Sequence, residues 1–164
     1  MDWALTQNNL AIVMHKLGDR RGDQALLWRA SDAYAAALKV CTRDAAPVNW
    51  AVTQSNLGLV LHTLGELRGE DALLQRAVAA FEAALTVHTR EAAPVDWAIA
   101  RTNLAGVLQV IGELYRDEAL MNRAVEAADA ALALFRNVKH TAFAHVARHV
   151  RDNARDALGR LRQE

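Results

Sequence analysis

The chain has little of the cysteine that stabilises small secreted or metal-binding proteins, and little of the proline and glycine typical of disordered ones. Its single cysteine, Cys41, has no disulfide partner within the chain, and no zinc-type spacing of Cys and His surrounds it. Two prolines and eight glycines in 164 residues are too few for a low-complexity or disordered chain. The remainder is rich in alanine, so the composition predicts an all-α fold in a reducing compartment.

An excess of one charge and long apolar runs are also missing. The 19 Lys and Arg residues balance 19 Asp and Glu residues, which disfavours a dedicated binder of nucleic acid or of an anionic membrane. No run of about 18 apolar residues occurs, and the first residues lack the basic segment and apolar core of a signal peptide. We therefore expect a single cytoplasmic domain over residues 1–164, with no membrane or nucleic-acid partner.

The chain repeats itself at a spacing of about 47 residues. Tryptophan recurs at Trp3, Trp50 and Trp97. Shorter matches keep the same register, as in Asn9-Leu10, Asn56-Leu57 and Asn103-Leu104. Units 2–48, 49–95 and 96–142 align without a gap, so the expected domain is built from three repeats.

Each unit has the pattern of two helices joined by a polar turn. In the second unit, apolar residues at three- and four-residue steps predict a first helix over 48–64 and a second over 71–89. A glycine tolerant of positive φ ends the first helix, an acid precedes the second, and a proline begins the next unit. These positions are Gly18, Gly65 and Gly112 for the glycine, Asp23, Glu70 and Asp117 for the acid, and Pro47 and Pro94 for the proline. Each unit is therefore expected to form a helical hairpin.

One hairpin cannot bury both of its apolar faces, so three in tandem predict an α-solenoid with a continuous core. The last segment, about 141–162, has a narrow apolar stripe from Phe143 to Leu161, and arginine and aspartate fill the rest of its surface. This pattern predicts a C-terminal capping helix over the end of the solenoid.

The pattern NLG-x6-G, then A-x3-F-x2-AL, then P resembles the tetratricopeptide repeat (TPR). In the second unit it comprises Asn56-Leu57-Gly58, Gly65, Ala77, Phe81, Ala84-Leu85 and Pro94, and the resemblance covers about residues 2–142. The unit is longer than the usual repeat of about 34 residues, and it is similar to the extended W-A-x-T-Q-x-N-L-G repeats of long bacterial multidomain proteins. The resemblance implies a non-catalytic scaffold in which the first helix of each hairpin lines a concave groove for a peptide or a partner helix.

The positions that match the family's groove form an apolar and amide-rich surface. They are Leu5, Asn9, Ile12, His15, Val52, Asn56, Leu59, His62, Ile99, Asn103 and Gln109. Some members of the family clamp an acidic C-terminus with cations, but Leu5, Val52 and Ile99 stand here instead, so we expect an apolar or neutral segment. The three asparagines fit two roles, which are hydrogen bonds to an extended peptide or bridges between neighbouring helices.

The tryptophans suggest a second kind of contact. Trp3, Trp50 and Trp97 begin the first helix of each unit, where a large ring seals the contact between hairpins. Trp28 replaces polar residues of the other two units and so falls at a position that normally faces solvent. Three roles fit Trp28, namely contact with an absent N-terminal repeat, self-association with a second copy, or a locally buried ring. The alternative function is therefore a self-assembling structural module, homodimeric or stacked end to end.

No residue pattern indicates catalysis, a cofactor or a metal. Nucleophile elbows, phosphate-binding glycine loops and HExxH motifs are missing. His145 and His149 are four residues apart but have no third ligand at helical spacing, so we expect two solvated histidines. Cys41 aligns with His88 and Phe135, a position that accepts very different side chains, and is expected to be a buried or half-buried spacer.

Overall fold

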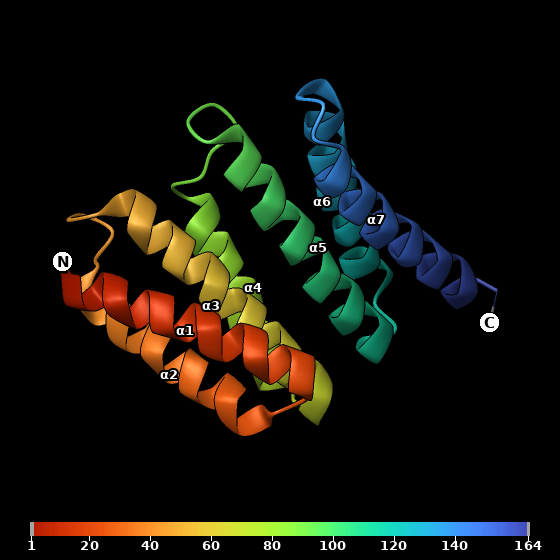
Figure 1. Ribbon diagram of the computed structural model, residues 1–164. Coiled ribbons are helices and arrows are strands. Elements are labelled where there is room, and N and C mark those ends of the chain that lie inside the picture. Colours follow the sequence, from red (N-terminus) through yellow and green to blue (C-terminus); the bar gives the residue numbers. More distant parts are fainter. Residues whose placement is uncertain (1, 164) are drawn as a thin grey trace. The chain divides into compact units, whose positions relative to one another are not determined.

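The computed structural model describes residues 2–163, and this part of the chain is all-helical (Figure 1), which confirms the predicted all-α class, while the α-solenoid stays a prediction. Its helices are α1 (Asp2–Arg21), α2 (Gln24–Val40), α3 (Pro47–Arg68), α4 (Asp71–Leu85), α5 (Pro94–Tyr115), α6 (Glu118–Asn137) and α7 (Thr141–Leu161). None of these helices is long and apolar enough to span a bilayer. The chain divides into two compact units, Met1–Val87 and His88–Glu164. The expectation of one continuous repeat domain stays a prediction.

The first unit consists of two helical hairpins. α1 packs against α2 and α3 packs against α4, while α2 and, to a smaller extent, α1 contact α3 (Figure 1). Tyr34, Leu61 and Phe81 are among the largest fully buried side chains. A Cβ on Gly58 of α3 would lie 2.9 Å from the ring of Phe81 on α4. The small residue at this position of the repeat therefore allows the paired helices to approach closely.

The helix starts follow the register of the repeat. Pro47 and Pro94 are the first residues of α3 and α5, where the missing N–H would have had no partner. Asp23 and Asp117 cap α2 and α6 by accepting hydrogen bonds from backbone N–H groups of the first turn. Glu70 holds the same place before α4, but its side chain does not cap the helix and instead accepts a hydrogen bond from Arg68. The predicted positions of the prolines and acids at helix starts are confirmed.

The prediction that a glycine ends each first helix was wrong at Gly18, Gly65 and Gly112. All three lie inside their helices. The residues with positive φ lie four positions later, at Gly22, Gly69 and Arg116. A Cβ on Gly65 would lie 2.6 Å from Cδ2 of Leu74. The repeated glycines are therefore needed for the close approach of the two helices beside their turn, and not for a left-handed backbone.

In the second unit, α5 and α6 form a hairpin, and α7 packs against both, more extensively against α6. Ala144 and Ala147 of α7 join Leu132 and Phe135 of α6 in one core. The rings of Phe135 and Phe143 stack with centroids 5.5 Å apart. The segment predicted as a C-terminal capping helix is therefore a helix that packs on the hairpin preceding it.

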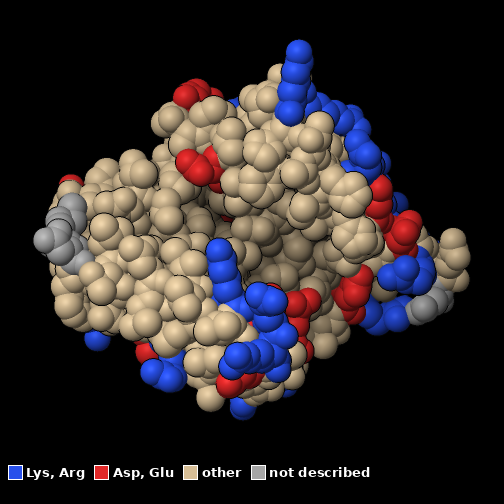
Figure 2. Space-filling model, in the orientation of Figure 1, with Lys and Arg blue, Asp and Glu red and all other residues tan. Residues whose placement is uncertain are grey.

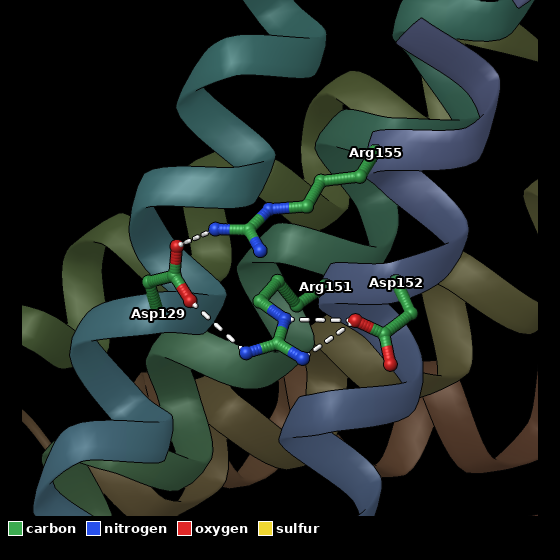
Figure 3. A network of polar contacts seen from close by, with 4 residues as sticks. All are labelled: Asp129, Arg151, Asp152 and Arg155. Atoms are coloured by element: carbon green, nitrogen blue, oxygen red, sulfur yellow. Dashed lines mark hydrogen bonds and ion pairs between the residues drawn. The ribbon is translucent and has the colours of Figure 1, made fainter. Parts of the chain in front are cut away.

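Ion pairs between charged side chains connect α7 to α6 (Figure 3). Arg155 donates a hydrogen bond to Oδ2 of Asp129 at 2.6 Å, and Nη1 of Arg151 lies 3.5 Å from Oδ1 of the same carboxylate. Arg151 also donates through Nε and Nη2 to Asp152. Together with the exposed Arg148 and Asp156, these residues give the solvent side of α7 a strongly charged character.

Candidate functional site

A cavity of about 200 Å³ lies between α1 and α3 in the first unit. Its walls are Ala4, Leu5, Asn8, Cys41, Asn49, Val52 and Thr53. Leu5 and Val52, two of the predicted groove residues, are exposed and line it from the two helices. In the view of Figure 2 the surface over the first turns of α1 and α3 is largely uncharged. The site is apolar with a few neutral polar groups, and we call it the α1–α3 groove.

A buried polar contact connects the two helices of the groove. Oγ1 of Thr53 lies 2.8 Å from the carbonyl oxygen of Asn49 and 3.3 Å from Oδ1 of Asn8. The hydroxyl has a single proton, which it donates to one of these two oxygens at a time. Both Asn8 and Thr53 are buried. Asn8 therefore bridges α1 to α3 and helps to hold the groove in shape.

The asparagines that recur in every repeat do not bridge helices. Asn9 is exposed, and Asn56 and Asn103 are half-buried. Within its own unit, the side-chain amide of none of the three forms a hydrogen bond to a described residue. The structure thus gives the bridging role to Asn8, and it leaves the amides of Asn9, Asn56 and Asn103 open to a ligand.

A polar pair spaced four residues apart lies toward the end of the first helix in successive repeats. Nε2 of His62 lies 3.6 Å from Oε1 of Glu66, and Gln109 donates a hydrogen bond to Glu113 at 3.1 Å. Burial lowers the pKa of His62 below its ordinary value, and the charge of Glu66 opposes this effect. Burial is also the main cause that lowers the pKa of His15. The lowered pKa values favour the neutral form of both imidazoles, so the charge at this end of the helices comes from carboxylates such as Glu66 and Glu113.

The remaining predicted groove residues belong to both units. Ile12 and Leu59 are half-buried on α1 and α3. On α5, Ile99, Asn103 and Gln109 are half-buried. Ile99 packs against the core formed by α5, α6 and α7, so this side chain contributes to packing within its own unit.

The tryptophans at the helix starts differ in their surroundings. Trp50 packs against a small core of Ala4, Ala37, Cys41 and Ala46, between the first hairpin and α3, as predicted. The ring of Trp97 has the guanidinium groups of Arg90 and Arg101 each 5.7 Å from its centroid. Trp3 is exposed. The prediction that all three rings seal a contact between hairpins was wrong for Trp3, because no hairpin of the first unit lies on that side of α1.

Trp28 on α2 is half-buried, and not fully exposed as its replacement of polar residues indicated. A role of Trp28 in self-association stays a prediction.

Cys41 at the wall of the groove is buried, as predicted. Burial raises the pKa of its thiol, which disfavours the reactive thiolate. Within residues 2–163, no three His, Cys, Asp or Glu side chains gather in a way that could hold a metal ion. His145 and His149 are exposed, and His149 lies 3.2 Å from the amide of Asn153.

No protein-family model matches the chain, and neither a curated protein nor a solved structure matches it. The resemblance to the TPR family therefore rests on the repeat pattern of this chain.

Proposed function

We propose that the protein is a non-catalytic TPR-like scaffold whose hairpins stack as a solenoid and whose α1–α3 groove binds an extended peptide or partner segment. The observation that carries this proposal is the cavity between α1 and α3, with exposed Leu5 and Val52 on its two sides. The unpartnered amides of Asn9 and Asn56 on the same helices offer both a donor and an acceptor to a peptide backbone.

The size and chemistry of the groove favour a neutral ligand. A volume of about 200 Å³ is below the range of about 300–1,000 Å³ typical of small-molecule sites, and suits one apolar side chain of a longer segment. Burial of apolar surface there contributes about 25 cal/mol per Å². A charged group would lose its hydration without gaining a counter-ion from the described wall residues, none of which carries an ionised side chain.

The test begins with selection from a displayed library of random short peptides on the full chain, followed by calorimetric titration of the selected peptides. We expect neutral, apolar sequences to be enriched, and replacement of the central apolar residue by Asp or Lys to abolish binding. Leu5→Asp and Val52→Asp are each expected to weaken binding at least about tenfold, because they place a charge at the cavity wall.

Leu114→Asp is the matched control, since Leu114 on α5 is 55% exposed and Leu5 is 56% exposed. The control should bind as the wild type does, and circular dichroism should show the same helix content in all variants. Joint replacement of Asn9 and Asn56 by Ala is expected to reduce affinity without unfolding the chain. Enrichment of acidic peptides, or unchanged affinity of Leu5→Asp and Val52→Asp, would contradict the proposal.

A further inference from the structure

A seam of apolar side chains runs along α1, on the side of this helix away from Leu5 and the groove. Trp3, Leu10, Val13 and Leu17 are 52%, 49%, 54% and 37% exposed. Trp3, Leu10 and Leu17 follow one another at seven-residue steps, and Val13 comes three residues after Leu10. This is the a/d spacing of a helix surface that packs against another helix. We call these four residues the α1 seam.

The repeat provides an internal comparison for the α1 seam. Leu57, Val60 and Leu64 of α3 are the equivalents of Leu10, Val13 and Leu17 one repeat later, and they have the same residue types. They are only 9%, 0% and 0% exposed, because α3 packs against α2 and α1 of the preceding hairpin. Equivalent residues therefore form an interface on α3 and stay open on α1.

The α1 seam does not have the character of a repeat-protein cap. Terminal elements of such proteins need a polar outer face to remain soluble. α7 has such a face, with Arg148, Asp152 and Arg155 exposed. The exposed side of α1 carries large apolar residues instead, which indicates a surface that another helix covers.

We propose that the α1 seam is the interface of a homodimer in which α1 packs antiparallel against α1 of a second copy. Three of its four residues are placed symmetrically about Leu10, since Trp3 and Leu17 lie seven residues to either side of it, and Val13 of one copy then faces Gln7 of the other. A two-fold axis at Leu10 places Trp3 of one copy against Leu17 of the other, so a single surface serves both copies. The antiparallel arrangement also aligns the two helix dipoles favourably.

The exposed area sets the strength of this dimer. About half of each of four large side chains is on the order of 400 Å² per copy, or roughly 800 Å² for the pair, which is below the range of about 1,200–2,000 Å² for stable complexes. The seam therefore predicts a weak dimer that dissociates at micromolar concentrations. This association is independent of the α1–α3 groove, whose residues occupy another face of α1.

Sedimentation equilibrium on the full chain, from about 1 to 500 µM, tests the proposal across the concentrations where so small an interface dissociates. The wild type should pass from monomer to dimer, and Leu10→Asp should weaken the dimer at least about tenfold, since it places a charge at its centre. Leu67→Asp is the matched control, because Leu67 on α3 is also 49% exposed and lies off the seam. Its dimerisation and the helix content of both variants should equal those of the wild type.

Cysteine crosslinking gives a second measurement that does not depend on a destabilising charge. With diamide as oxidant, Leu10→Cys should form a disulfide dimer, because the two-fold axis brings both copies of this position together. A mixture of Trp3→Cys and Leu17→Cys should crosslink, whereas Leu17→Cys alone should not. Native Cys41 is buried and should not contribute.

Four results would overturn the proposal. These are a wild type that is monomeric at all concentrations, a mass that grows beyond dimer, a Leu10→Asp variant that dimerises like the control, and crosslinking of Leu17→Cys alone. A wild type that is always monomeric would mean that a different chain covers the seam, and a mass beyond dimer would indicate end-to-end stacking. If Trp28→Gln abolishes the dimer and Leu10→Asp does not, the interface lies on α2.

Discussion

Replacement of Gly65 by alanine tests why glycine recurs beside each hairpin turn. The residue lies inside α3, and a Cβ there would be 2.6 Å from Cδ2, 2.8 Å from Cγ and 3.2 Å from the backbone nitrogen of Leu74 in the first turn of α4. The Leu74 side chain is 1% exposed, so it has no free volume into which it can move. The backbone of α4 would have to shift as well.

The expected change in stability is the difference of two opposing effects. Alanine in place of glycine in a helix gains about 1 kcal/mol from backbone entropy. Overpacking of a buried contact costs about 1–3 kcal/mol. Because both Cγ and a backbone atom of Leu74 are too close, we place the cost in the upper half of that range and expect Gly65→Ala to destabilise the protein by about 1–2 kcal/mol.

Urea denaturation followed by circular dichroism measures this change, with Gly159→Ala as the control. Gly159 lies inside α7, and no atom would come within 4 Å of its added Cβ, so this variant should gain up to about 1 kcal/mol. In a Leu74→Ala background the contacts with Cδ2 and Cγ are gone and only the one with the backbone nitrogen remains, so Gly65→Ala should lose most of its cost. If Gly65→Ala stabilises the chain as Gly159→Ala does, the close-approach explanation is refuted.

Three further predictions compare residues that the repeat makes equivalent or adjacent. Trp50→Ala should reduce the free energy of unfolding by about 3 kcal/mol and Trp3→Ala by less than about 1 kcal/mol, measured by urea denaturation at concentrations where the chain is monomeric. Asn8→Ala should cost about 1 kcal/mol in the same assay because it removes the bridge to α3, whereas Asn9→Ala should cost nothing measurable; equal effects would contradict the assignment. The folded chain lowers the pKa of His62, so the unfolded state binds more protons and stability should fall as the pH falls from about 7 through the unfolded pKa of 6.5 toward the lowered pKa. His62→Gln, the residue of the third repeat, should flatten this dependence in thermal melts, and an unchanged slope would assign it to other groups.

The helices and their starts follow from local chemistry, which explains why the sequence could predict them. A proline tolerated only in the first helical turn gives the start of α3 at Pro47 and of α5 at Pro94. An aspartate before an apolar run gives the caps at Asp23 and Asp117. These signals act within a few residues, so they do not depend on what packs around them.

The sequence predicted which helix faces line the groove, but not which side chains form contacts there. The repeat placed Leu5 and Val52 on corresponding faces of two helices, and the structure brings them to one cavity. The sequence did not reveal the contact between Asn8 and Thr53, because two adjacent asparagines look alike in a sequence and only the approach of α3 makes one of them the buried partner. The same approach leaves Asn9 without a partner.

The sequence by itself determined the repeat, the helical pairs and the chemical character of each face, because these depend on residue type and spacing. The tertiary structure decided which equivalent faces are buried. Val13 and Val60 are the same residue at the same repeat position, yet one is 54% exposed and the other fully buried. The difference arises because α3 has a hairpin before it in the first unit and α1 has none. The burial of a side chain depends on which helix packs against it, and a local sequence pattern carries no information about that helix.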